Sequence, residues 1–248
     1  MITKYHRPET LEETLSLLTK PDTLPLGGGT LLTTLKSATV EVVDIQALGL
    51  NTIHKKGNYL EIGATATLQQ LLENEHTPEK LKSALKLEAP LNIRNAATVA
   101  GALVVADGRS TFGTVMLALD TKLTVHPGDE EVEIGSFLPL RADNLSGKLI
   151  TRITIPLNAE LAFESVARTP ADKPIVCAAL AQWPSGRTRL ALGGYGKAPL
   201  LAMDGTEAEG IEAAASNAFH EATDEWASAE YRTDVAATLA KRCAEKIS

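Results

Sequence analysis

The sequence predicts an α+β protein in two parts, on three observations. Helix and strand patterns alternate over residues 8–155, and Pro156 stops the last strand of that series. Beyond it, three strand-like runs come first and helical patterns last. Hydrophobic residues are 44% and charged residues 22% of the 248-residue chain, a mixture typical of packed domains. We therefore expect one domain over 1–156, split near residue 55, and a second over 157–248.

Apolar spacing and capping residues define the elements of the first part. Leucines at 11, 15 and 18 share one face of a helix within 8–20. Thr30 is a suitable N-cap for a helix over 31–35, and Thr67 with Gln70 has capping-box spacing. Further helices are expected over 78–88 and 112–119, and strands over 24–26, 40–45, 59–62, 122–125 and 149–155. The last of these alternates like an edge strand.

The second part predicts an antiparallel sheet followed by helices. Its three strands cover 162–168, 175–182 and 187–192, joined by turn residues such as Pro184-Ser185-Gly186. Ser228 is the expected N-cap of a final helix over 228–246. Glu230 lies near the positive end of that helix, and basic residues lie near its negative end.

Charge and cysteine content exclude several classes of protein. A net charge of -7 and a pI near 5.3 argue against a nucleic-acid backbone or an anionic membrane as the main partner. No signal peptide begins the sequence, and no apolar run has the roughly 18 residues of a membrane span. Cys177 and Cys243 predict buried free thiols in a cytoplasmic protein, with one disulfide between them as the alternative.

Two short segments rich in small residues could bind phosphate. GGGT at 27–30 lies between a strand and a helix start, where backbone N–H groups and missing side chains favour an anion. A tight turn is an equal alternative. For ATVAGA at 97–102, close packing of buried backbone is favoured over a diphosphate surface. Together the two segments would suit the pyrophosphate of an extended dinucleotide.

Other catalytic patterns are missing from the sequence. The five histidines have no metal-ligand spacing to one another or to a cysteine, and no GxSxG motif occurs. We therefore expect no catalytic residue and no metal ligand on this chain. A cofactor would carry any redox chemistry.

The order of segments resembles the FAD-binding medium subunit of molybdenum hydroxylases, the family of carbon monoxide dehydrogenase medium subunits and the xanthine dehydrogenase flavin domain. LPLGGGTLL (24–32) is similar to the family's first flavin loop, AGGTDLL, and EIGATATLQQL (61–71) to its IGAxTT segment. The segment 92–120, which contains IRNAATVAGA, is similar to IRNxATIGGN and the residues after it. Further similar segments follow in the same order: 150–156, 167–180, 190–199 and 228–242.

This resemblance implies a two-part FAD-binding domain of the PCMH type, then a smaller domain with a three-stranded antiparallel sheet and helices. It implies that electrons pass from [2Fe-2S] clusters of an iron–sulfur small subunit to FAD, and then to a soluble acceptor. Substrate would react on a molybdopterin large subunit. The implied cofactor-binding residues are Gly27, Gly28, Gly29, Thr30, Leu31, Thr98, Val99, Ala100, Gly101, Ala102, Thr111 and Ile150.

Four of these residues depart from the family pattern. Ala100 replaces a glycine, Ala102 an asparagine and Thr111 an aspartate, and Leu31 stands where Asp or Ser is usual. Each lost hydrogen bond would remove about 0.5–1.5 kcal/mol of binding free energy. A structural or assembly subunit that has lost the flavin is therefore the alternative function.

Overall fold

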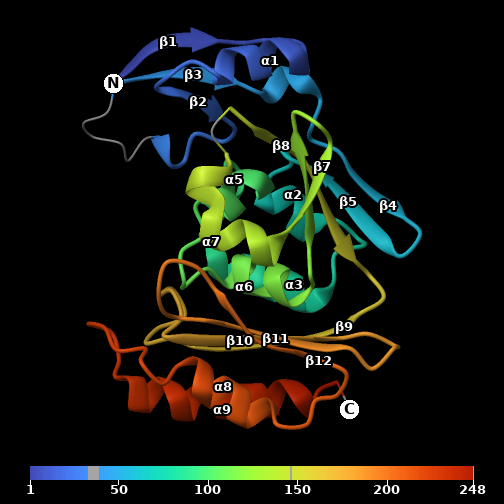
Figure 1. The fold of residues 1–248 in the computed structure, drawn as a ribbon, viewed down its shortest axis with the longest axis vertical. Helices are drawn as coiled ribbons and strands as arrows, with labels where there is room; N and C mark the ends of the chain where they lie inside the picture. Colours follow the sequence, from blue (N-terminus) through green and yellow to red (C-terminus); the bar gives the residue numbers. More distant parts are fainter. Residues whose placement is uncertain (33–38, 146, 248) are drawn as a thin grey trace.

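The fold is described by a computed structural model covering residues 1–32, 39–145 and 147–247. Three β-sheets follow one another along the long axis of the molecule (Figure 1). The N-terminal sheet lies at one end, helices and a five-stranded sheet form the middle, and a four-stranded sheet covered by two helices forms the other end.

The N-terminal sheet is parallel and has the order β1-β3-β2. Its strands are β1 (Ile2–His6), β2 (Thr23–Leu26) and β3 (Val40–Asp44). The predicted first helix is confirmed as α1 (Leu11–Leu18), where the Thr10 hydroxyl accepts the Glu13 N–H. The helix expected over 31–35 lies mostly outside the described residues.

The middle sheet has the order β4-β5-β8-β6-β7. Its strands are β4 (Ile53–Lys56), β5 (Tyr59–Gly63), β6 (Lys122–His126), β7 (Glu130–Glu133) and β8 (Leu149–Pro156). The interpretation of 149–155 as an edge strand was wrong, because β8 pairs with both β5 and β6. Its alternation arises because Ile153 faces the buried helices while Arg152 faces solvent.

Helices cover one face of this sheet (Figure 1). The helices of this part of the chain are α2 (Leu68–Glu73), α3 (Glu79–Glu88), α4 (Leu91–Arg94), α5 (Val99–Val104), α6 (Thr111–Ala118) and α7 (Ile134–Asn144). The predicted capping box of α2 is confirmed: the Thr67 hydroxyl accepts the Gln70 N–H at 3.1 Å, and Gln70 Oε1 accepts the Thr67 N–H at 2.8 Å. All residues of α6 are buried, because the C-terminal sheet lies on one side of it and α3, α5 and α7 lie on the other.

The C-terminal sheet is antiparallel, with the order β12-β11-β10-β9. Its strands are β9 (Glu160–Val166), β10 (Val176–Gln182), β11 (Thr188–Gly193) and β12 (Leu200–Gly205). The three predicted strands are confirmed, but β12 makes the sheet four-stranded in the described chain rather than three-stranded. The division of the chain into domains at Pro156, where β8 ends, stays a prediction.

Strand β10 separates two hydrophobic cores. Its odd-numbered residues, such as Cys177 and Ala179, belong to the core shared with α6. Its even-numbered residues, such as Ala178 and Leu180, face α8 (Ile211–Ala218) and α9 (Ala229–Ala244). Both cysteines of the sequence lie within the described residues and are buried and free, as predicted. No helix in the described ranges is long and apolar enough to cross a membrane.

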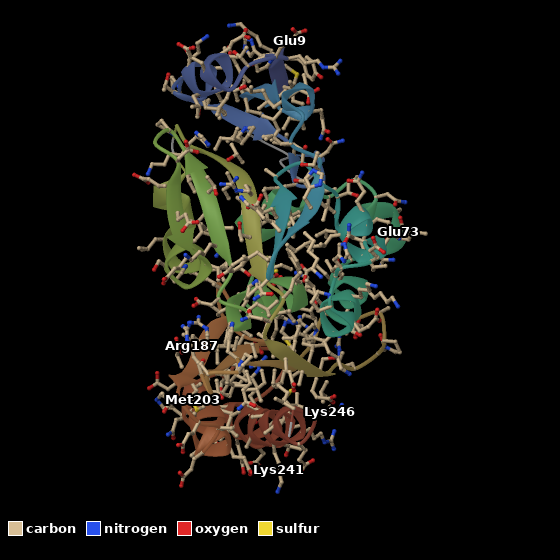
Figure 2. All side chains as sticks on the ribbon, turned by 90° about the vertical axis from the view of Figure 1, so that its right-hand side faces the viewer. Glu9, Glu73, Arg187, Met203, Lys241 and Lys246 are labelled. Carbon is tan, nitrogen blue, oxygen red and sulfur yellow. The ribbon has the colours of Figure 1, made fainter. Side chains whose placement is uncertain are left out.

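A cluster of four charged side chains joins the C-terminal sheet to the end of α6. Nη1 of Arg189 lies 2.6 Å from Asp204 and 3.2 Å from Asp120. Arg187 contacts the same two carboxylates at 2.8 and 2.9 Å. Figure 2 shows Arg187 where the middle and C-terminal parts meet. Hydrogen bonds from Arg187 and the nearby charge of Arg189 hold the pKa of Asp204 below its usual value.

Arg232 of α9 is fully buried and organises the loops at one end of the C-terminal sheet. Its guanidinium donates to the carbonyls of Ile175, Gly194, Ala222 and Ala227 and to the carboxylate of Asp224, the last at 2.8 Å. Because a buried charge without partners is costly, these contacts fix three chain segments around one side chain. Asp224 supplies the countercharge.

Replacing Asp224→Asn should lower the free energy of unfolding by about 1–3 kcal/mol at neutral pH, because Arg232 loses its anionic partner. Burial raises the pKa of Asp224, but hydrogen bonds from Arg232, Trp226 and Ala227 outweigh burial and keep this pKa below its usual value. The stabilisation is therefore complete above the unfolded-state pKa of about 3.9 and is lost as the pH falls towards the lower folded-state value. Denaturant unfolding at several pH values measures both effects.

The matched control is Asp234→Asn, which removes an exposed carboxylate from α9, the helix that carries Arg232. It should leave the unfolding free energy within about 0.5 kcal/mol of wild type. Equal losses in the two variants would contradict the role given to Asp224.

Candidate functional site

The loop of three glycines directly follows β2 and packs against residues 96–98. A Cβ atom on Gly28 would lie 1.7 Å from the carbonyl oxygen of Ala96, and one on Gly27 would lie 2.9 Å from Thr98 Oγ1. Gly29 has a φ of 70°, in the left-handed region that favours glycine. The two segments predicted to bind phosphate are therefore neighbours, and glycine is what lets them approach.

The first loop also offers backbone donors. The N–H groups of Gly28 and Gly29 donate to no acceptor in the described part of the chain, and both residues are partly exposed. The carbonyl of Gly27 is held by the Gln46 side chain at 3.1 Å. Adjacent N–H groups without a protein acceptor suit an anion, so this loop fits a phosphate group.

The second loop uses its donors inside the protein. Val99 N–H donates to the Ala66 carbonyl at 2.8 Å, and Ala100 N–H to the Ala64 carbonyl at 3.3 Å. Gly101 N–H donates to Thr98 Oγ1 at 3.1 Å, which caps α5, and Ala102 N–H to the Thr98 carbonyl. Residues 98–102 are therefore closely packed buried backbone, the alternative that the sequence favoured. They form a surface on which the glycine loop packs.

Ala100 and Ala102 are each 8% exposed and belong to the large hydrophobic core. Val99 and Thr98 are also buried, and Gly101 is partly exposed. Leu31 is 48% exposed, next to the glycine loop, and Thr30 is partly exposed. The methyl groups of the two alanines are thus accommodated by the core.

Thr111 and Ile150 lie in the core. The Thr111 hydroxyl donates to the Ala84 carbonyl at 2.8 Å and lies 3.1 Å from a carboxylate oxygen of Glu88. Ile150 is 3% exposed and lies on β8 opposite Val125. The structure brings 27–31 and 98–102 together, while the Thr111 side chain is engaged with α3.

The sequence reasoning did not single out Thr65, in the segment similar to IGAxTT. Its hydroxyl is buried and has no hydrogen-bond partner among the described residues. Its neighbours Ala64 and Ala66 accept the N–H bonds of the second loop, and its own N–H donates to the Leu50 carbonyl at 2.8 Å. An unsatisfied buried hydroxyl costs about 1–3 kcal/mol, so a bound group that reaches it would recover hydrogen bonding.

The two arginine side chains near the second loop, Arg94 and Arg109, already donate hydrogen bonds to other groups of the protein. Arg94 donates to Gln69 Oε1 at 2.9 Å and to the Ala89 carbonyl at 2.6 Å. Arg109 donates to the carbonyls of Lys173 and Pro174. Within the described ranges, no group of three His, Cys, Asp or Glu side chains could hold a metal ion. An anion here would be bound chiefly by backbone.

Residues 1–158 match the model of a protein family described as the FAD binding domain in molybdopterin dehydrogenase. The chain belongs to this family. It is 29% identical over 219 residues to the glyceraldehyde dehydrogenase medium chain of Sulfolobus acidocaldarius, an alignment covering 81% of this chain and 78% of that one. The chain is therefore an oxidoreductase-family subunit with an FAD-binding domain.

Solved structures of two oxidoreductases share the fold of this chain. The Cu,Mo-CO dehydrogenase in its cyanide-inactivated form aligns with a TM-score of 0.83 and 25% identity, over 100% of this chain and 98% of that chain. Quinoline 2-oxidoreductase from Pseudomonas putida 86 aligns with a TM-score of 0.82 and 22% identity, over 98% and 96% of the two chains. The family expected from the segment order is confirmed.

Thr98→Val should lower the free energy of unfolding by about 1 kcal/mol, because valine keeps the shape of the side chain but removes the oxygen that caps α5. Thr98→Ser keeps that oxygen and should retain most of the stability. Urea unfolding of both variants measures the difference. Equal stability of the two would show that the capping bond does not hold the second loop.

Proposed function

We propose that this chain is the FAD-binding electron-transfer subunit of a molybdenum-containing hydroxylase or dehydrogenase. It takes electrons from [2Fe-2S] clusters on a small subunit and passes them to a soluble acceptor, while substrate reacts on a molybdopterin large subunit. The observation that carries the proposal is the glycine loop, whose Gly28 and Gly29 N–H groups have no acceptor in the described chain. Family membership and the medium-chain relative support it.

In this proposal the first loop binds the pyrophosphate of FAD. The N–H groups of Gly28 and Gly29 donate to phosphate oxygens, and Gln46 holds the loop through the Gly27 carbonyl. FAD supplies the redox chemistry, because it accepts and releases electrons that no side chain here can carry. The protein residues bind and orient it.

Residues 98–102 and Thr65 have supporting roles in this proposal, next to the glycine loop. Thr98 and Gly101 fix the start of α5, against which the glycine loop packs. We propose that the Thr65 hydroxyl, which has no partner among the described residues, forms a hydrogen bond with the bound cofactor. Thr30, Leu31, Val99 and Ile150 remain proposed members of the site, whereas Thr111 acts through its contacts with α3.

Iron–sulfur clusters must come from another subunit. A [2Fe-2S] cluster takes four protein ligands, mostly cysteines, whereas this sequence has two cysteines in all. Both are buried. The division of labour between this chain and its partners therefore agrees with its composition.

Incubating the purified chain with FAD and removing unbound cofactor should leave the visible absorption bands of a bound flavin, with one equivalent per chain. Titration followed by flavin fluorescence gives the affinity, expected at micromolar or tighter. Absence of binding in the isolated chain and also in its complex with native partners would reject the proposal. It would favour the alternative, a structural subunit that has lost flavin binding.

Gly29→Ala should weaken FAD binding about tenfold, equivalent to about 1.4 kcal/mol, because the methyl group strains a left-handed residue that supplies a donor. Its matched control is Gly57→Ala. Gly57 has a φ of 60° in the β4–β5 turn, with no atom within 4 Å of the added carbon.

Both variants should lose similar stability, about 1 kcal/mol, because both place a side chain in the same backbone region. Only Gly29→Ala should change the FAD dissociation constant. An unchanged constant in Gly29→Ala would place the pyrophosphate elsewhere.

A further inference from the structure

Two cavities of the described chain lie outside the glycine loop. One, of about 250 Å³, is formed by the segment between β9 and β10 together with the end of α3. Its walls are apolar at Leu87, Ala167, Pro170 and Pro174 and polar at Ser165, Arg168, Thr169 and Asp172. Half of the lining residues are apolar and half are polar, and the volume suits a ligand smaller than a drug-sized molecule.

Arg168 is the positively charged residue that lines this pocket, and two contacts hold its guanidinium in place. Its Cζ lies 4.5 Å from the ring centroid of Trp226, and its Nε donates to Asp172 at 3.2 Å. Its two Nη groups have no acceptor among the described residues, and the side chain is 56% exposed. A guanidinium fixed on an aromatic ring, with an open edge, is preorganised to bind a carboxylate through two parallel hydrogen bonds.

A second arginine completes this arrangement. Arg109 also lies 4.5 Å from the Trp226 centroid, and it donates to the carbonyls of Lys173 and Pro174 at 2.6 and 2.9 Å. The backbone beside the pocket is therefore anchored to the same tryptophan. The loop that forms the pocket is held in place before any ligand binds.

The three cations and three carboxylates named around the pocket balance in charge. Asp172 pairs with Arg168, and Asp107 pairs with Lys173 at 2.6 Å. Arg109 donates to uncharged carbonyls, and Glu88, next to Leu87, accepts the Phe112 N–H at the start of α6. The open edge of Arg168, rather than an excess of local charge, is therefore what would attract an anion.

We infer that this pocket binds a small organic carboxylate with an apolar body, separately from the FAD site. The carboxylate pairs with the open edge of Arg168, and the apolar body lies against Leu87 and the two prolines. Trp226 and Arg109 are positioning residues, since they hold Arg168 and the pocket wall without lining the cavity. The site is independent of the proposed electron-transfer role.

The sequence provides a direct optical test, because it has two tryptophans, Trp183 and Trp226. In a Trp183→Phe background of the full chain, emission reports on Trp226 alone. Titration with benzoate should give a saturable change with a dissociation constant of about 1 mM or tighter. Benzamide, which has the same shape without the charge, should bind at least about tenfold more weakly, and so should inorganic phosphate, which lacks the apolar body.

Arg168→Gln should weaken benzoate binding at least about tenfold, measured by isothermal titration so that altered Trp226 emission does not interfere. Arg242→Gln removes an exposed arginine from α9 and should leave the affinity unchanged. Equal binding of benzoate and benzamide, equal binding of phosphate, or an unaffected Arg168→Gln variant would overturn the inference. Displacement of benzoate by FAD would also overturn it, because the pocket would then belong to the cofactor site.

Discussion

The contact on which the architecture depends is the burial of α6 between the C-terminal sheet and the helices of the middle part. Its residues pack on β10 and β11 on one side and on the helices of the middle part on the other. The start of a fully buried helix needs acceptors for its N–H groups. Glu88 of α3 provides one carboxylate oxygen that accepts from Ser110, Thr111 and Phe112. One carboxylate thus joins α3 to the helix that connects two cores.

This contact gives a physical reason for Thr111. The resemblance leads to an aspartate at that position, where a second carboxylate would lie beside Glu88 in a buried setting. Two like charges there would raise the cost of burial, whereas the uncharged threonine hydroxyl donates to the Ala84 carbonyl and lies 3.1 Å from Glu88. Residues 88 and 111 are therefore a matched pair, and the departure concerns folding of the helix more than contact with a cofactor.

Local signals predicted the elements that are amphipathic or capped. The Thr67–Gln70 capping box, α1, α9 and three strands of the C-terminal sheet all lie at the expected places. The start of α5 could not be recognised, because a helix of six residues buried on several sides shows no 3.6-residue period. The position of β8 also follows from pairing partners distant in sequence, which alternation does not reveal. For the proposed site, the sequence singled out both loops as candidates, but it could not show that the Gly28 and Gly29 N–H groups of one have no acceptor in the described chain while those of the other bond within the protein.

The two cysteines give the protein a chemical property of practical value. Both side chains are fully buried, and burial raises the pKa of Cys177 and of Cys243 to about 12. Thiolate is the reactive form of cysteine, so neither residue reacts readily with alkylating or oxidising reagents while the chain is folded. Thiol-specific reagents should therefore label neither natural cysteine of the folded protein to a significant extent. A single cysteine introduced on the surface could carry a spectroscopic label without removing either natural one.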